Sequence, residues 1–249
     1  MSPARKAFWA VLLTFVAGWV NTGGYIWTAR VLTGNMSGDT IESALYALTG
    51  HANIAWMHAT ALLLFLGGLL ACRFLHDALA RRKWKSTACV TLLLELALVL
   101  TATALLLRDA AGLPLAIIAC LAFALGLQNA TLTRVGILSL RTTHVTGTIS
   151  HFAEAFADYV FWVRDEWRTA RVPFHQLPRD SWHNEHFQVS LVTFAVWVAF
   201  FLGAVCFLLA QTRLGYFALL PPMGLLLCAI ISDVISPMQR SGQQPAPLV

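Results

Sequence analysis

Six stretches of this sequence are apolar and long enough to cross a membrane as α-helices. A hydrocarbon core of about 30 Å requires roughly 20 such residues. Charged residues make up 12% of the chain, about half the ~25% share typical of soluble domains. The sequence therefore predicts an all-α polytopic membrane protein with six transmembrane helices. The six stretches are residues 8–28, 54–75, 87–107, 113–133, 189–211 and 214–235.

Two further stretches, 36–49 and 149–162, are shorter and more polar. Their apolar side chains recur at helical spacing, but helices of this length are too short to span a bilayer. We expect two short re-entrant half-helices. The periodic residues are Ile41, Leu45 and Leu48 in the first stretch and Phe152, Phe156 and Tyr159 in the second.

The distribution of Lys and Arg favours this arrangement. If both half-helices return to the side they came from, 14 of the 17 Lys and Arg residues share a side with the two termini. If both cross fully, the division is 9 to 8. The positive-inside rule favours the first topology. We expect a multi-pass protein of the bacterial inner (plasma) membrane with both termini cytoplasmic, whose net charge of +5 needs no nucleic-acid partner.

Polar motifs occur twice, once in each half of the chain. Three spans per half is an odd number, so the second half is expected to lie upside down relative to the first, as a 3+3 inverted-topology repeat. We expect a first repeat over 1–110, a second over 111–235 with a cytoplasmic loop at 163–187, and a disordered cytoplasmic tail at 236–249. The paired motifs are Gly18-x-x-Asn21 with Gly126-x-x-Asn129, Leu32-Thr-Gly-Asn35 with Val145-Thr-Gly-Thr148, and Phe65-Leu-Gly67 with Phe201-Leu-Gly203.

These motifs predict a solute site at mid-membrane, between the N-termini of the two half-helices. Backbone N–H groups and the positive ends of helix dipoles favour an anionic or neutral polar solute there. Hydroxyl and amide side chains would add hydrogen bonds. The candidate substrate-binding residues are Asn21, Thr33, Gly34, Asn35, Gln128, Asn129, His144, Thr146, Gly147 and Thr148.

Three acidic residues are candidates for proton or ion handling: Glu95, Asp39 and Glu154. Glu95 lies within an otherwise plain apolar span, where a carboxyl group is costly and is by default functional or paired. The alternative for Glu95 is a satisfied structural pair or a position at the lipid edge. Asp39 falls in the first turn of a half-helix, where it would also serve to offset the helix dipole.

The chain offers little to an enzyme, a metal or a cofactor. Its five cysteines are scattered singly, and His183-x-x-His186 has no further ligands beside it, so we expect neither a metal site nor a cofactor. No Ser/His/Asp or Cys/His set, P-loop or dinucleotide glycine motif is present. We do not expect catalysis.

The motif set, above all Gly126-Leu-Gln-Asn-Ala130 followed by Thr143-His-Val-Thr-Gly-Thr148, resembles the YoaK family of bacterial integral membrane proteins, defined as a domain of unknown function. The resemblance covers residues 8–235 and implies a multi-span inner-membrane protein without naming a substrate. Two departures stand out. Family members commonly carry Asp where this chain has Asn21, which weakens a proton- or sodium-coupled mechanism built on that position. The 159–187 region is longer than usual.

Three functions remain open, and a transporter of a small polar or anionic solute fits the paired motifs best. A passive channel is the first alternative, since the plan is similar in outline to an aquaporin, although the half-helices occupy different places and no Asn-Pro-Ala occurs. The second is a non-transporting scaffold or sensor subunit, with loop 163–187 contacting a cytoplasmic partner. A homo-oligomer is compatible with all three.

Overall fold

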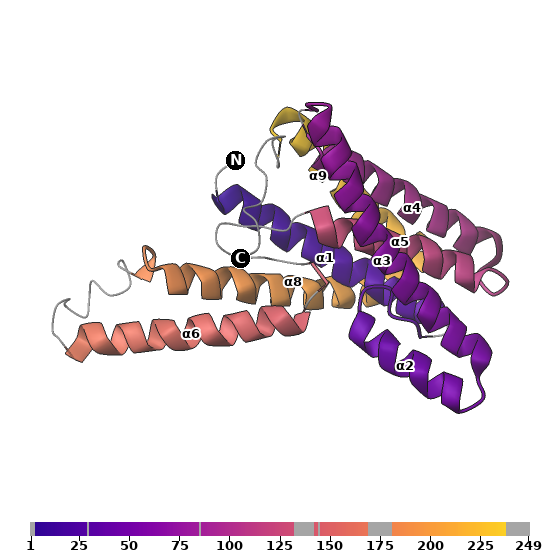
Figure 1. Cartoon of the computed structure of the whole chain (residues 1–249), viewed down its shortest axis with the longest axis horizontal. Coiled ribbons are helices and arrows are strands. Elements are labelled where there is room, and N and C mark those ends of the chain that lie inside the picture. The colour runs from indigo at the N-terminus through magenta and orange to yellow at the C-terminus, as the bar shows by residue number, and fades with distance from the viewer. Residues whose placement is uncertain are drawn as a thin grey trace.

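The computed structural model describes residues 3–28, 30–84, 86–131, 142–143, 145–168 and 181–237. The regular structure in this part of the chain is helical (Figure 1). The helices are α1 (Pro3–Trp27), α2 (Met36–Leu48), α3 (Ala52–Arg81), α4 (Ala88–Asp109), α5 (Pro114–Thr131), α6 (Val145–Arg168), α8 (Glu185–Leu214), the 3-10 helix η1 (Gly215–Leu219) and α9 (Leu220–Ile235).

Five stretches of the described chain are long and apolar enough to cross a membrane. Four are single helices, and the fifth, Glu185–Ile235, runs through α8, η1 and α9. The two C-terminal spans expected from the sequence both fall within this fifth stretch. Gly215 divides it, because its positive φ of 55° is a left-handed conformation that glycine adopts without a steric penalty. The protein is thus an α-helical, multi-pass membrane protein.

Helices α3 and α5 pack through a pair of glycines. A Cβ on Gly68 or on Gly126 would overlap a backbone carbonyl oxygen of the facing helix, so the two backbones are in direct contact. Further along both helices, Cys72 Sγ lies 3.8 Å from Thr131 Oγ1; the two helices therefore run parallel. Small residues that let helix backbones approach are typical of membrane interfaces.

Helices α1 and α8 pack through the same kind of glycine–backbone contact. Gly18 and Gly203 each face a backbone carbonyl oxygen of the other helix, and Gly23 further along α1 faces the ring of Phe207, so this pair is also parallel. The residues involved are related by constant offsets. Phe15 and Gly18 precede Phe123 and Gly126 by 108 residues, and Phe65 and Gly68 precede Phe200 and Gly203 by 135.

The predicted equivalence of Gly67 with Gly203 is off by one residue. Gly68 makes the backbone contact, whereas Gly67 faces the ring of Phe123 at 3.4 Å. Because Gly67 and Gly68 are adjacent, the sequence allows either one to be aligned with Gly203. Only the contact with the facing helix α5 distinguishes the two alignments.

Polar contacts join the helix ends at one end of the bundle. The Arg5 guanidinium at the start of α1 donates to the Ser232 hydroxyl of α9 at 2.8 Å, and Ser86 before α4 donates to Asp233. Helix α9 therefore runs antiparallel to both α1 and α4. The described chain begins and ends at this one end of the molecule.

The two short helices differ from each other. Helix α2 matches the expected 36–49 within one residue, but α6 runs over Val145–Arg168, 24 residues, so the expected 149–162 is too short at both ends. The polar residues after 162 suggested a loop. They instead continue an amphipathic helix that packs along α8, with Phe152 against Phe194 at 5.5 Å and Tyr159 against Phe187 at 5.1 Å between ring centroids.

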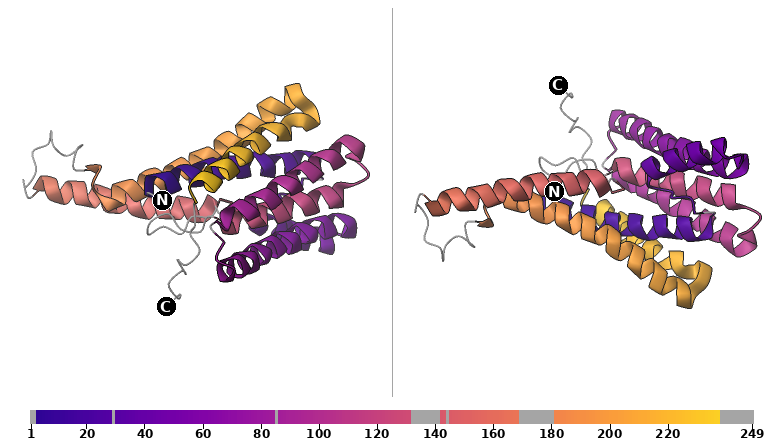
Figure 2. Two further views of the ribbon diagram at one scale, coloured as in Figure 1. Left: turned by 90° about the horizontal axis from the view of Figure 1, so that it is seen from above. Right: turned by 90° about the horizontal axis from the view of Figure 1, so that it is seen from below.

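Helices α6 and α8 lie side by side and extend together away from the other helices (Figure 2). The expected cytoplasmic loop at 163–187 includes the last turn of α6 and the first turn of α8. Its residues 169–180, and residues 238–249 of the expected tail, lie outside the described residues.

We expect Gly126→Leu to destabilise the folded protein strongly, because its side chain would collide with the α3 backbone. Overpacking costs about 1–3 kcal/mol even where flexible side chains can yield, and here the obstacle is backbone. The matched control is Gly224→Leu on α9, where a Cβ meets no atom within 4 Å. Thermal unfolding in detergent measures both; equal melting temperatures for the two variants would contradict the glycine contact.

Candidate functional site

The segment Leu32–Asn35, here called loop 1, connects α1 to α2 and is held by a side chain of α1. Asn21 Oδ1 accepts a hydrogen bond from the Gly34 backbone N–H at 2.7 Å, and the bond is buried. A buried non-helical backbone donor inside an apolar bundle needs such a partner, because an unpaired one would be costly. Asn21 is thus a structural acceptor for loop 1 in this conformation.

Asn129 of α5 does the same for the segment before α6. Its Oδ1 accepts from the Thr143 backbone N–H at 3.2 Å. Thr142 and Thr143, here called loop 2, therefore correspond to Thr33 and Gly34 of loop 1.

Sequence reasoning chose Thr146 and Gly147 as that counterpart, because they repeat the letters Thr-Gly. They lie in the first turn of α6 instead, where Thr146 is exposed and Thr148 is buried. Spacing gives the better guide: the acceptor and the donor are 13 residues apart in the first case and 14 in the second. Counting on from Asn129 would have pointed to loop 2.

The two loops meet inside the bundle. A Cβ on Gly34 would lie 3.1 Å from Thr143 Cγ2, 3.1 Å from Leu125 Cδ1 and 3.3 Å from Asn21 Oδ1. The structure thus brings together four of the predicted site residues, Asn21, Thr33, Gly34 and Asn129, and adds Thr142 and Thr143.

Three buried oxygen atoms on loop 1, loop 2 and helix α5 have no hydrogen-bond partner: Thr33 Oγ1, Thr142 Oγ1 and Gln128 Oε1. Gln128 uses only its amide N–H, which donates to the Leu13 carbonyl at 2.9 Å. Buried polar atoms are almost always satisfied, so each exception needs an explanation such as a water or a ligand. One such hydroxyl lies on each loop.

Asp39, in the first turn of α2, has the most specific environment among the three acidic candidates. Its Oδ1 accepts from the Leu32 backbone N–H of loop 1 at 3.2 Å and lies 2.7 Å from His58 Nδ1 of α3, while Oδ2 is buried without a partner. Burial raises the pKa of Asp39 to about 6, because desolvation outweighs the opposing effect of His58. His58 was not among the predicted site residues. Because a buried carboxylate is costly without a partner, a search of the sequence for a partner of Asp39 could have pointed to it.

The other two acidic candidates lie in contrasting places. Glu95 of α4 is 1% exposed, and neither of its carboxyl oxygens has a partner. Glu154 lies on the surface of α6, where His151 approaches it at 3.6 Å. Its surroundings are those of a solvated ion pair.

Two further predicted site residues are not among those that the structure brings together where loop 1 and loop 2 meet. Asn35 is exposed and accepts from the Ser37 hydroxyl at 3.1 Å, and His144 lies outside the described residues. Among the residues that the structure describes, no group of three or more His, Cys, Asp or Glu side chains is arranged to hold a metal ion.

Replacing Asn21 with Leu should leave the Gly34 N–H buried without an acceptor. An unsatisfied buried donor costs about 1–3 kcal/mol, so we expect a lower melting temperature and faster hydrogen exchange at the Gly34 amide. Asn21→Asp keeps an acceptor oxygen and serves as the control. Unchanged exchange at Gly34 in Asn21→Leu would rule out this role for Asn21.

Comparison with known proteins gives one family. A family model described as "Protein of unknown function (DUF1275)" matches residues 9–232. A curated protein from Bacillus subtilis (strain 168), the UPF0700 transmembrane protein YoaK, is 26% identical over 156 residues, which cover 62% of this chain and 69% of that protein. No solved structure matches the chain. With a family model matching almost its whole length, and with the resemblance already carried by its paired motifs, the chain belongs to the DUF1275 family, of the YoaK kind.

Proposed function

We propose that this protein is a transporter of a small polar or anionic solute, which binds where loop 1 and loop 2 meet. The observation that carries the proposal is the set of three unpartnered buried oxygens, Thr33 Oγ1, Thr142 Oγ1 and Gln128 Oε1. A polar solute would satisfy oxygens that the protein itself leaves without hydrogen bonds. Hydroxyl groups both donate and accept, so they suit a solute that carries either kind of group.

The charges at the N-termini of α2 and α6 differ, which supports a preferred orientation of the solute in the site. The first turn of α2 contains Asp39, which offsets the positive end of that helix dipole. The first turn of α6 contains no acidic residue, so its dipole is available to a negatively charged group. An anionic group of the solute would face α6, and a hydroxyl or amide group would face loop 1.

We further propose the inverted-repeat plan for the two halves. The matching glycine contacts of the α1–α8 and α3–α5 pairs and the matching Asn-to-loop hydrogen bonds support it. On this plan α8 and α9 cross separately, giving six spans, and the starts of α2 and α6 re-enter the membrane from opposite sides. Transporters with such repeats place the solute at the repeat interface, near discontinuous helices.

The orientation in the inner membrane follows from charge. The bundle end that holds Arg5 and Asp233 also holds the basic segment Arg81–Lys83 at the C-terminal end of α3. The positive-inside rule makes this end cytoplasmic, with both termini. Helices α6 and α8 would then extend toward the cytoplasm.

A passive channel is the second candidate, and the packing at Gly34 argues against it. An open channel needs a continuous path, whereas side chains from Asn21, Leu125 and Thr143 surround the Gly34 position at 3.1–3.3 Å. A closed midpoint flanked by unsatisfied oxygens fits alternating access better than permanent conduction.

The binding site is tested by thermal unfolding of the purified protein in detergent. The screen covers inorganic anions, carboxylates, nucleobases, sugars and metal salts. A ligand at one hundred times its Kd stabilises the native state by about 2.7 kcal/mol, so a true ligand gives a clear upward shift. We expect the shift to disappear in the double variant Thr33→Val/Thr142→Val and to persist in Thr101→Val, whose hydroxyl is exposed on α4. An equal shift in the double variant would place the ligand elsewhere.

Transport itself is tested with proteoliposomes loaded with the compound found in that screen. We expect Gly34→Leu to abolish flux, because a branched side chain would fill the space between the two loops. Gly224→Leu, at an open position on α9, should transport as the wild type does. Full flux through a Gly34→Leu protein that elutes as a folded, monodisperse species would refute the proposed location.

A further inference from the structure

The Asp39–His58 pair connects the surface of α2 and α3 to loop 1. Asp39 Oδ1 receives two hydrogen bonds, one from the Leu32 N–H of loop 1 and one shared with His58 Nδ1. An ionised carboxylate can only accept, so the ring nitrogen is assigned as the donor when Asp39 is ionised. Both side chains are almost fully buried, with 1% and 2% of their surface exposed. The residue after Leu32 is Thr33, with its unpartnered hydroxyl.

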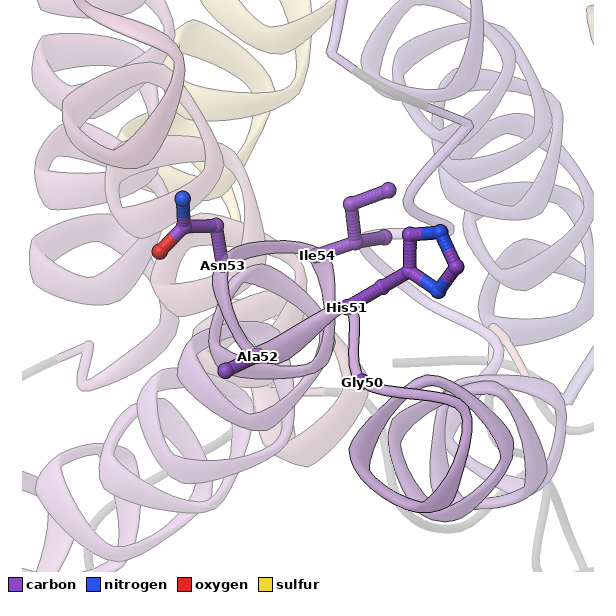
Figure 3. Close-up of a pocket in the computed structure, with 5 residues that line it drawn as sticks. All are labelled: Gly50, His51, Ala52, Asn53 and Ile54. Carbon is purple, nitrogen blue, oxygen red and sulfur yellow. The ribbon is translucent and has the colours of Figure 1, made fainter.

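Aromatic rings lead from this pair to the outside of the molecule. Tyr46 stacks on His58, with ring centroids 5.8 Å apart, and also lies 6.0 Å from the ring of His51. His51 lines a pocket of about 360 Å³ at the turn between α2 and α3, together with Gly50, Ala52, Asn53 and Ile54 (Figure 3). In this view His51 and Asn53 point away from each other. Successive side-chain contacts thus connect an exposed turn to a buried carboxyl group, in the order His51, Tyr46, His58 and Asp39.

The described positions of the second half that correspond to Asp39 and His58 carry no ionisable groups. At the offset that relates Gly34 to Thr143, Asp39 corresponds to Thr148; at the offset that relates Gly68 to Gly203, His58 corresponds to Thr193. Both threonines are buried, and the Thr193 hydroxyl bonds to the Val189 carbonyl of its own helix at 2.8 Å. One half carries ionisable groups at these two places and the other carries hydroxyls.

We infer that Asp39 and His58 bind the proton that drives transport, and that they pass its effect to the solute site through loop 1. The inference rests on the proposed function and names its coupling ion. One proton binds Asp39 Oδ2, which is buried without a partner, and takes the carboxyl group from a single negative charge to neutral. The carboxyl then loses acceptor strength toward the Leu32 N–H, and loop 1 is released from α2. Loss of the proton restores the charge and the hydrogen bond.

The surroundings favour a proton over a metal cation. The titratable groups close to Asp39 along the chain are Glu42 and Tyr46 of α2, His51 at the turn and His58 of α3. The other titratable groups of α3 lie more than three helical turns beyond His58: Cys72, Arg73, His76, Asp77 and Arg81. The charged residues of α1 lie at its far end, Arg5 and Lys6, and α5 contains none. Sodium requires several oxygen ligands, whereas the nearest group to Asp39 is an imidazole nitrogen at 2.7 Å. A group raised to a pKa of about 6 changes its protonation close to neutral pH.

The protonation step is tested without any solute, by infrared difference spectroscopy of the full-length protein in nanodiscs between pH 5 and pH 8. We expect a protonated-carboxyl band that titrates near pH 6, that vanishes in Asp39→Asn, and that shifts its midpoint in His58→Gln. Asp109→Asn at the exposed end of α4 and Thr148→Ala in the other half should leave the band unchanged. A band that persists in Asp39→Asn would overturn the assignment.

The coupling step is tested with the compound found by thermal shift, in proteoliposomes with an imposed pH gradient. We expect the wild type to accumulate it when the pH gradient is present and Asp39→Asn to bind and exchange it without accumulation. Gradient-driven accumulation by Asp39→Asn, or accumulation by the wild type in a sodium gradient at equal pH, would overturn the inference. Failure of any compound to bind the wild type would instead count against the solute site, while the infrared result stands independently.

Discussion

The fold depends on the need to satisfy backbone hydrogen bonds inside an apolar bundle. Two non-helical segments enter it, and each has an amide N–H that no helix accepts. Asn21 and Asn129 supply the missing acceptors from the neighbouring helices α1 and α5. In the absence of water, an uncharged amide does this at much lower cost than a carboxylate would. These two side chains allow non-helical segments to exist inside the bundle.

Glycine packing determines where those loops lie. The α1–α8 and α3–α5 contacts bring the backbones together at Gly18 with Gly203 and at Gly68 with Gly126. Each asparagine follows its glycine by three residues, less than one helical turn away. The close crossing therefore fixes the helix that carries the acceptor, and the acceptor fixes the loop. In each half of the chain, van der Waals contact positions one helix, and one hydrogen bond from that helix then positions one loop.

Much of this arrangement could be predicted from the sequence, and the errors have physical causes. The bounds of α2 and the segments of the apolar helices follow from periodicity and length. The end of α6 did not, because Arg164–Arg168 is polar yet continues the helix. Loop 2 was missed because matching letters at Thr146-Gly147 outweighed matching spacing from Asn129. The partner of Asp39 is His58, 19 residues away, and only the packing of α2 on α3 brings them together.

The pairing of helices also has a consequence for synthesis. Helix α1 leaves the ribosome before the other described helices, but its main packing partner, α8, begins at Glu185, so the Gly18–Gly203 crossing forms only after α8 has been made. The α3–α5 crossing forms much earlier. Since chains fold domain by domain as they emerge, the N-terminal helix must wait in the bilayer with its glycine face uncovered. A chain truncated before α8 would retain that exposed face, and its backbone would meet lipid in place of α8.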